Sequence, residues 1–201
     1  MESFRFNHNN EAHAMLFYPV SNPGKIKQRI IDAAKSKGHE AEEEREAVNF
    51  SFIDASLITS RLHLETALNQ AILAESQGSL RTKTVHSEIL FALNPTNNIT
   101  EAIRRYGVSD TTKALLVVQI VNSSATTATA ASISDVEIQM KNVVNGTIVS
   151  FDELAKLTDW NTVEKYHKLG NEVKEKRDVA QARAFIDNVA VSSVAMKSVM
   201  Q

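Results

Sequence analysis

Short apolar runs, separated by turn residues and by amphipathic stretches, form the main pattern of the chain. The run at 114–121 is apolar at nearly every position, which is typical of a strand at the centre of a sheet. The run at 14–20 ends in Ser-Asn-Pro-Gly, a sequence that favours a turn. The run at 85–93 ends at Asn94-Pro95, where a strand is expected to terminate. Strands are therefore predicted at 14–20, 50–54, 85–93, 114–121 and 147–149.

Between these runs, apolar residues recur at helical spacing, as in Ile26, Ile30 and Ala34. Asn98 or Thr100 supplies a capping side chain for one of these segments, because a short polar side chain accepts a hydrogen bond from a free backbone N–H. Helices are predicted at 26–34, 57–72, 99–106, 136–144, 150–169 and 172–200. Strands interleaved with helices indicate an α/β (α+β) fold, in which a small mixed or antiparallel sheet packs against several helices. We expect one domain over residues 1–201.

Three segments stand outside this core pattern. Residues 1–12 are polar, and we expect a flexible N-terminus. Residues 37–48 carry an acidic run, which is interpreted as a solvated insertion. Residues 122–132 are small, polar and repetitive, and a Ser/Thr/Ala loop is expected there.

The composition is that of an ordinary globular protein, with 201 residues, 43% hydrophobic and 23% charged. The formal net charge of −2 implies that any contact with nucleic acid comes from a local basic patch. The absence of cysteine excludes disulfides, thiolate nucleophiles and cysteine-based zinc sites, and it favours the cytosol or nucleus. We find no signal-peptide pattern and no apolar run of about 18 residues, so no membrane partner is expected.

Sequence motifs for catalysis are absent. The chain has no Gly-x-Gly-x-x-Gly, P-loop, His-Glu-x-x-His or Gly-x-Ser-x-Gly sequence, and its six histidines are scattered. The adjacent His86 and Ser87 would point to opposite faces of a strand and would not meet. We therefore predict no catalytic residue, no metal ligand and no cofactor, and we expect that the chain is not an enzyme.

One segment carries a basic pattern. If residues 81–84 are extended, Arg81 and Lys83 lie on the same face of the strand. Two cations on one face, close to hydroxyl groups, can hold a phosphate backbone or a single-stranded end. The alternative is that both side chains are simply solvated where the strand begins.

The residues around this segment resemble the signature of a known family, the kinase-binding small subunit of the KEOPS (EKC) complex. In that family a basic-Thr-basic-Thr sequence precedes a polar pair, a glutamate and an apolar stretch. A Pro-containing, Asn-rich turn and a helix that begins Ile-[Ser/Thr]-Glu-Ala and ends in Gly then follow. The matching residues are Arg81-Thr82-Lys83-Thr84, Ser87-Glu88-Ile89, Asn94-Pro95-Thr96-Asn97-Asn98-Ile99-Thr100-Glu101-Ala102 and Tyr106-Gly107-Val108. A second stretch, Val149-Ser150-Phe151 and Val163-Glu164-Lys165-Tyr166-His167-Lys168-Leu169, is also similar.

The resemblance implies a role that residue patterns alone do not. KEOPS attaches a threonylcarbamoyl group to adenosine 37 of tRNAs that read codons beginning with A, and another of its subunits performs this chemistry. The family's member binds the small atypical kinase/ATPase of the complex and, through it, the other subunits, and it holds the 3′ CCA end of tRNA. The resemblance further implies localisation in the nucleus and cytoplasm and, in fungi, links to telomere maintenance and transcription.

The resemblance also suggests which residues take part. Arg81 and Lys83 are expected to contact tRNA, with Asn97 and Asn98 nearby at a turn or helix start. Free N–H groups at a helix N-terminus favour phosphate and would help the asparagine turn to contribute.

The last predicted helix is the candidate for the kinase interface. Its apolar arc comprises Phe185, Ile186, Val189, Val191 and Val194. Core packing is the alternative for Ile186 and Val189, which lie on the main apolar stripe. The wider arc, including Val194, is difficult to bury on one side only, so a partner laid against it is expected.

Two other functions remain as alternatives. One is a protein-interaction adaptor without direct RNA binding, in which the basic pair is solvated. The other is a small-molecule enzyme with an unrecognised site, which requires a deep pocket lined by convergent ionisable groups.

Overall fold

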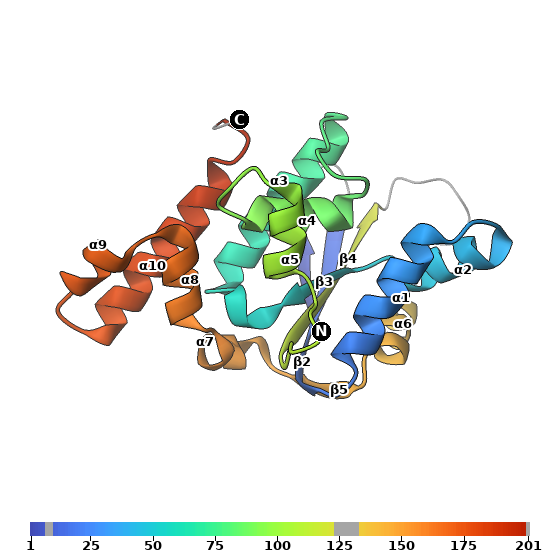
Figure 1. Ribbon diagram of the computed structural model, residues 1–201, viewed down its shortest axis with the longest axis horizontal. Coiled ribbons are helices and arrows are strands. Elements are labelled where there is room, and N and C mark those ends of the chain that lie inside the picture. Colours follow the sequence, from blue (N-terminus) through green and yellow to red (C-terminus); the bar gives the residue numbers. More distant parts are fainter. Residues whose placement is uncertain (7–9, 123–132, 200–201) are drawn as a thin grey trace. The chain divides into compact units, whose positions relative to one another are not determined.

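The computed structural model describes residues 1–6, 10–122 and 133–199. The chain forms two compact units, each built from two segments that are separate in the sequence (Figure 1). The sheet unit comprises residues 1–54 and 107–149, and the helical unit comprises residues 55–106 and 150–201. The expected combination of a small antiparallel sheet with several helices is confirmed, whereas a single domain over 1–201 stays a prediction.

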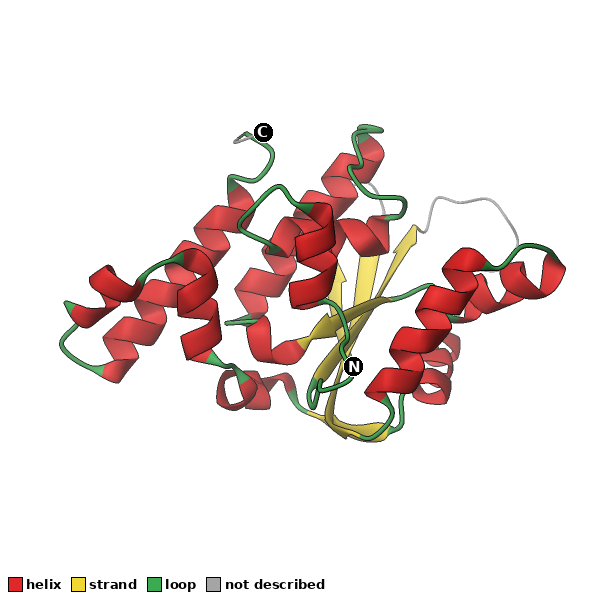
Figure 2. Ribbon diagram, in the orientation of Figure 1, coloured by secondary structure: helices red, strands yellow, loops and turns green. Residues whose placement is uncertain are grey.

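The sheet unit contains a five-stranded sheet in which all the pairings are antiparallel (Figure 2). Its strands are β1 (Glu2–Arg5), β2 (Asn10–Val20), β3 (Ser51–Asp54), β4 (Leu115–Asn122) and β5 (Gly146–Val149). The order is β1-β2-β4-β3, and β5 pairs with β2. β4 therefore lies between two other strands, which confirms the central position predicted from its continuous apolar run. Val117 and Val118 point to opposite faces of the sheet and both are fully buried, which explains why β4 shows no polar alternation.

Three helices belong to the sheet unit: α1 (Pro23–Lys35), α2 (His39–Ala47) and α6 (Ile133–Val143). Met15 of β2 lies opposite Val117 of β4 in the register, and both belong to one hydrophobic cluster. α1 and α6 contribute Ile26 and Met140 to the same cluster. In each strand every second side chain points to the same face, and these side chains thus bury one face of the sheet under α1 and α6.

Helices alone make up the regular structure described in the second unit. They are α3 (Arg61–Ser76), α4 (Val85–Leu93), α5 (Ile99–Tyr106), α7 (Leu154–Leu157), α8 (Trp160–His167), α9 (Gly170–Lys174) and α10 (Val179–Ala195), with 3-10 turns η1 (Ala55–Leu57) and η2 (Phe151–Glu153). α3 packs against α4 and α10, α4 packs against α5, and α8 and α9 pack against α10. Of the helices in the described ranges, none has the length and apolar character needed to cross a membrane.

The main error in the predicted elements concerns residues 85–93, which were expected to form a strand and instead form α4. Every residue of this helix except Ser87 is buried, so its apolar residues show no one-sided period. A short, uniformly apolar run fits a buried strand and a buried helix equally well. The deciding signal is Thr84, whose side chain forms a reciprocal capping box with Ser87.

Two of the segments set apart in the sequence are also ordered. Residues 2–5 form β1 and pair with β2, which itself begins at Asn10, so the expectation of a flexible segment over 1–12 is wrong for these residues. Phe4 is buried, and its burial favours this pairing. The acidic segment at 37–48 forms α2, whose glutamates are largely exposed, as the solvated interpretation requires. Within the predicted loop at 122–132, Asn122 ends β4 and residues 123–132 lie outside the described part of the chain.

Candidate nucleic-acid interface

The basic pair lies in a bent connection, which we call the basic loop (residues 79–84), between α3 and α4. Arg81 and Lys83 are both exposed, although the backbone around them is not the extended strand that the prediction assumed. The buried carboxylate of Glu88 organises this backbone. Its Oε2 atom accepts hydrogen bonds from the Arg81 N–H at 3.0 Å, the Thr82 N–H at 2.8 Å and the Thr82 hydroxyl at 2.7 Å. The loop is thus held by a carboxylate from the helix that follows it.

The asparagine turn (residues 94–98) connects the other end of α4 to α5. Asn97 and Asn98 are exposed there. The Asn98 Oδ1 atom accepts a hydrogen bond from the Glu101 N–H at 2.9 Å, which confirms that Asn98 caps the helix. Asn94 is fully buried, and its Nδ2 atom donates to the Thr96 hydroxyl at 2.8 Å. These hydrogen bonds fix the conformation of the turn, in which Asn97 and Asn98 are exposed to solvent.

The structure does not bring the four predicted tRNA contacts into one cluster. Arg81 and Lys83 precede α4, whereas Asn97 and Asn98 follow it, and α4 is nine residues long. A helix of that length spans roughly 13 Å. A ligand that contacts both pairs has to extend along the length of α4, as an unpaired strand can.

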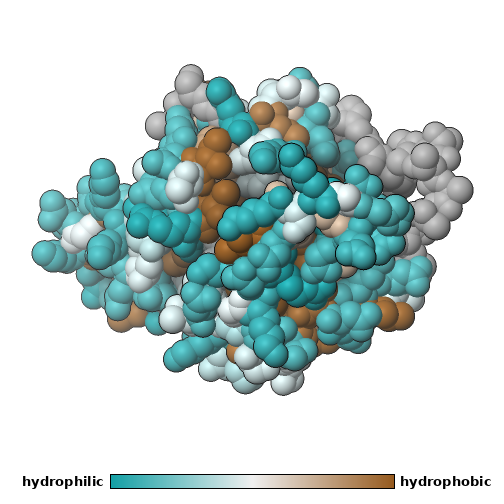
Figure 3. Space-filling view, turned by 45° about the vertical axis from the view of Figure 1, so that its right-hand side comes forward, coloured by the Kyte–Doolittle hydropathy of each residue, from teal (hydrophilic) through white to brown (hydrophobic). Residues whose placement is uncertain are grey.

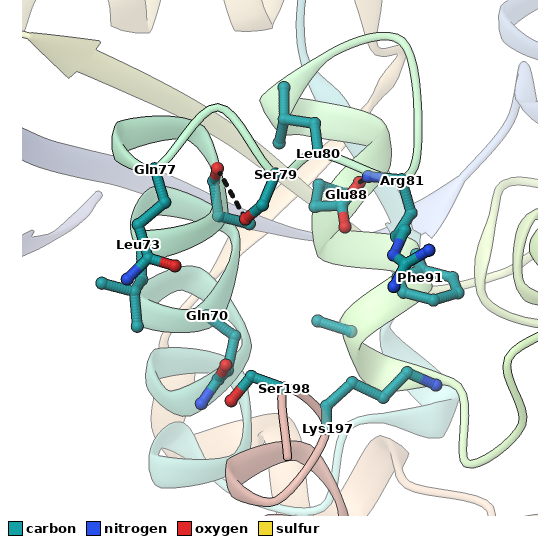
Figure 4. Close-up of a pocket in the computed structure, with 12 residues that line it drawn as sticks. Gln70, Leu73, Gln77, Ser79, Leu80, Arg81, Glu88, Phe91, Lys197 and Ser198 are labelled. Atoms are coloured by element: carbon teal, nitrogen blue, oxygen red, sulfur yellow. Dashed lines mark hydrogen bonds between the residues drawn. The ribbon is translucent and has the colours of Figure 1, made fainter. Parts of the chain in front are cut away.

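A cavity of about 450 Å³ opens beside the basic loop within the helical unit (Figure 4). Its lining comes from α3, the basic loop, α4 and the turn that follows α10. The charged side chains among its lining residues are Arg81, Glu88 and Lys197. Glu88 already accepts hydrogen bonds from the basic loop. The remaining charged residues of the lining are the cations Arg81 and Lys197, and Leu73 and Phe91 supply apolar surface.

Lys197 is the residue of this site that the sequence interpretation missed. Its Nζ atom donates hydrogen bonds to the carbonyl oxygens of Asn94 at 2.7 Å and Thr96 at 2.6 Å, and it lies 4.5 Å from the centroid of the Phe91 ring. Burial lowers the pKa of Lys197 to about 8, against the opposing effect of the Glu88 carboxylate. The one available signal was that Lys197 is the single charged residue after Asp187.

The predicted kinase-interface residues divide into two sets on α10. Ile186 and Val194 are buried, in line with Ala190 on one stripe of the helix. The expectation that Val194 belongs to an arc that is difficult to bury is therefore wrong, because residues four apart on a helix share one face. Phe185, Val189 and Val191 are only partly buried.

On the face shown in Figure 3, hydrophilic residues predominate and apolar side chains occupy smaller areas between them. Phe185, on α10, already has a cationic neighbour, because the Nζ atom of Lys176, which precedes the helix, lies 4.1 Å from the centroid of its ring. Among the predicted interface residues, Val189 and Val191 thus remain as partly exposed apolar side chains.

Comparison with known proteins identifies the family. The family described as "Kinase binding protein CGI-121" matches residues 17–198. The chain belongs to the CGI-121 family. The match includes the basic loop, the asparagine turn, the whole of α10 and Lys197.

Curated relatives agree with this assignment over nearly the full length. The chain is 33% identical to a Neurospora crassa protein named "EKC/KEOPS complex subunit cgi121", with 98% of each chain covered. It is 31% identical to the "EKC/KEOPS complex subunit CGI121" of Cryptococcus neoformans, with 94% of this chain and 93% of that protein covered. A protein of the same name in Aspergillus terreus is 34% identical over 79% of this chain and 74% of its own length.

Three histidines of the helical unit, His63, His86 and His167, are shielded from solvent, and none of them lines the cavity. Burial lowers the pKa of His63 to about 3, with a further contribution from His167, and it lowers the pKa of His86 and of His167 to about 4. The His63 Nδ1 atom lies 3.1 Å from the Thr59 hydroxyl, which donates to Asp187 at 2.6 Å. Among the described residues, no group of three or more His, Cys, Asp or Glu side chains is arranged to hold a metal ion.

Proposed function

We propose that this chain is a non-catalytic subunit of a KEOPS/EKC complex that binds the small kinase of the complex and holds tRNA for threonylcarbamoyladenosine modification. The observation that carries the proposal is the family match over 17–198, together with near full-length relatives that are named as subunits of this complex. The resemblance stated from the sequence supports the same role, with action in the nucleus and cytoplasm and, as in fungal relatives, a link to telomere maintenance.

For tRNA, the basic loop and the cavity beside it form the contact surface in this proposal. Arg81 is an exposed cation that lines a cavity of about 450 Å³, which offers polar and apolar surface to an unpaired nucleotide, and Lys83 is exposed two residues further along the same loop. Phosphates pair with the cations, while a base occupies the cavity against Leu73 or Phe91. The 3′ CCA end is the single-stranded part of tRNA that such a site accepts, and Asn97 and Asn98 contact the strand further along α4.

For the kinase, the exposed side of α10 forms the contact surface in this proposal. Val189 and Val191 are partly buried and lie on the two flanks of the stripe that is buried through Ile186 and Val194, because residues two apart on a helix are about 200° apart around its axis. An amphipathic helix with residual apolar surface suits a groove or lobe on a partner. The family's description as a kinase-binding protein supports a kinase as this partner.

The test for the tRNA site uses the double variant Arg81→Glu, Lys83→Glu. Its affinity for a tRNA transcript with an intact CCA end should fall by at least about tenfold at low salt, because two phosphate contacts become repulsions. The matched control is Lys174→Glu, Arg177→Glu, which makes the same change in charge at two exposed positions of the same unit. Equal affinities of the two double variants would refute the tRNA site.

The test for membership in the complex is co-purification of the tagged chain with the kinase and the other KEOPS subunits. Retention of the kinase by the Arg81→Glu, Lys83→Glu variant is expected, since these residues lie away from α10 in the sequence and on other elements. If the kinase co-purifies but the wild-type chain does not bind tRNA, the alternative holds and the protein is an interaction adaptor. Absence of the kinase from the purified material would refute the proposal as a whole.

A further inference from the structure

Lys197 connects two parts of the helical unit that are distant in sequence. Its Nζ atom bonds the Asn94 carbonyl, 103 residues earlier, and the Thr96 carbonyl, 101 residues earlier. We propose that Lys197 is a positioning residue for RNA binding, which holds the asparagine turn in the conformation that presents Asn97 and Asn98. The inference rests on the proposed function, since it concerns the same tRNA contact.

The chemistry of the turn explains why a lysine is needed. The last carbonyls of a helix and of the residues that cap it have no intrahelical partner. Asn94 caps α4 and is fully buried, so its carbonyl oxygen is poorly placed for solvation by water. An ammonium group has three donors and no acceptor, and it can therefore bond two converging carbonyls at once. A positive charge is also favourable at the negative end of the α4 dipole.

Other side chains share only part of this role, because the Thr96 carbonyl oxygen also accepts a hydrogen bond from the Asn94 Nδ2 atom at 3.1 Å. The Asn94 amide donates to Thr96, and Arg105 donates to the Asn94 Oδ1 atom at 3.3 Å. These bonds hold the Asn94 side chain, whereas Lys197 holds the main-chain carbonyls on either side of Pro95. The ammonium thereby fixes the backbone that leads directly into Asn97 and Asn98.

The position of Lys197 separates this role from direct contact with RNA. The residue is only 6% exposed, and its Nζ atom is engaged with two carbonyls and the Phe91 ring. Arg81 and Lys83, in contrast, are exposed. A phosphate contact contributes to the salt dependence of binding, about 0.7 of a unit in the slope of log K against log salt for a single strand. A positioning residue changes the affinity and leaves this slope unchanged.

The experiment compares the full chain with Lys197→Met, which keeps the length and removes the donors, and with Lys197→Arg, which keeps donors. Lys174→Met is the control for loss of one exposed lysine. Two quantities are measured: hydrogen exchange of the amides over 94–99 in the free protein, and tRNA affinity over a range of salt concentrations. We expect faster exchange in the turn and about tenfold weaker binding with an unchanged salt slope for Lys197→Met. Recovery of most of the affinity is expected in Lys197→Arg.

Each outcome decides a separate point. Unchanged exchange in the turn, or unchanged tRNA affinity, in folded Lys197→Met overturns the inference. A weaker affinity with a salt slope reduced by about 0.7 also overturns it, because Lys197 would then contact phosphate itself. If Lys197→Met does not fold, Lys197→Gln, which keeps donors but has a shorter, neutral side chain, replaces it and is judged by the same criteria. A wild type that does not bind tRNA refutes the proposed function, and the exchange measurement then decides by itself whether Lys197 orders the turn.

Discussion

Mild acid should destabilise the helical unit through its buried histidines. In the folded state, burial lowers the pKa of His63 to about 3 and the pKa of His86 and His167 to about 4. In the unfolded chain each imidazole has an ordinary pKa of 6.5. The unfolded state therefore binds more protons below this value, and the free energy of unfolding falls as the pH is lowered through 6.5.

The size of the effect follows from the two pKa values of each residue. Protonation of one histidine in the unfolded chain is favourable by about 1.4 kcal/mol at pH 5.5 and by less than about 0.1 kcal/mol at pH 7.5, while the folded imidazole stays neutral at both. Three residues together lower the free energy of unfolding by roughly 4 kcal/mol between these pH values. This loss is a large part of the total stability of a typical domain, about 5–15 kcal/mol.

The assay is urea unfolding at pH 7.5 and pH 5.5, followed by the fluorescence of Trp160, the only tryptophan of the chain, which lies in the same unit as the three histidines. His167→Gln should reduce the pH-dependent loss by about one third, because one of three titrations is removed. His39→Gln is the control, since that imidazole is 85% exposed and paired only with Glu43 among the ion pairs described. Equal stability of the wild type at the two pH values would refute the reasoning and mean that the imidazoles are hydrated in the folded state.

Two further predictions concern single helices. Thr84→Ala removes the cap of α4 and should lower the free energy of unfolding by about 1 kcal/mol in the same urea assay. Thr100→Ala should be nearly neutral, because Asn98 provides the cap of α5. Equal effects of the two substitutions would contradict this account. Val191→Asp should weaken kinase binding in calorimetry with little change in melting temperature, because Val191 is partly exposed. Val194→Asp places a carboxylate at a fully buried position and should lower the melting temperature strongly. Full-strength binding by Val191→Asp would mean that the Val191 flank of α10 is not the interface.

The sequence predicts elements well where one physical signal is sufficient. The long apolar run of β4 and the cap at Asn98 lead to correct elements, because burial on both faces and local hydrogen bonding are visible in neighbouring residues. Residues 85–93 are the counter-example, since complete burial removes the period by which a helix is recognised. A prediction from that run alone had to rely on composition, and the short polar cap that decides the matter was overlooked.

The candidate site was predicted only as far as its local residues extend. Arg81, Lys83, Asn97 and Asn98 are exposed as expected, but the strand geometry that united the first pair is wrong. Lys197 escaped the prediction because its partners lie about a hundred residues away, and no local pattern encodes such a contact. The choice between Val191 and Val194 on α10 was similarly inaccessible, because it depends on which stripe of the helix packs against other elements.

The divided construction of the helical unit has a consequence for synthesis on the ribosome. Residues 55–106 emerge early, but α10, which packs against α3, belongs to the segment from 150 onward. At a translation rate of about 5–20 residues per second, roughly 5–20 seconds separate the synthesis of the end of α3 at Ser76 from that of the start of α10 at Val179. During that interval the apolar sides of α3 and α4 lack their partner helix, so the nascent chain is a candidate for chaperone protection. The asparagine turn can acquire its contact with Lys197 only after this delay, which makes the proposed RNA-binding surface one of the last parts of the molecule to fold.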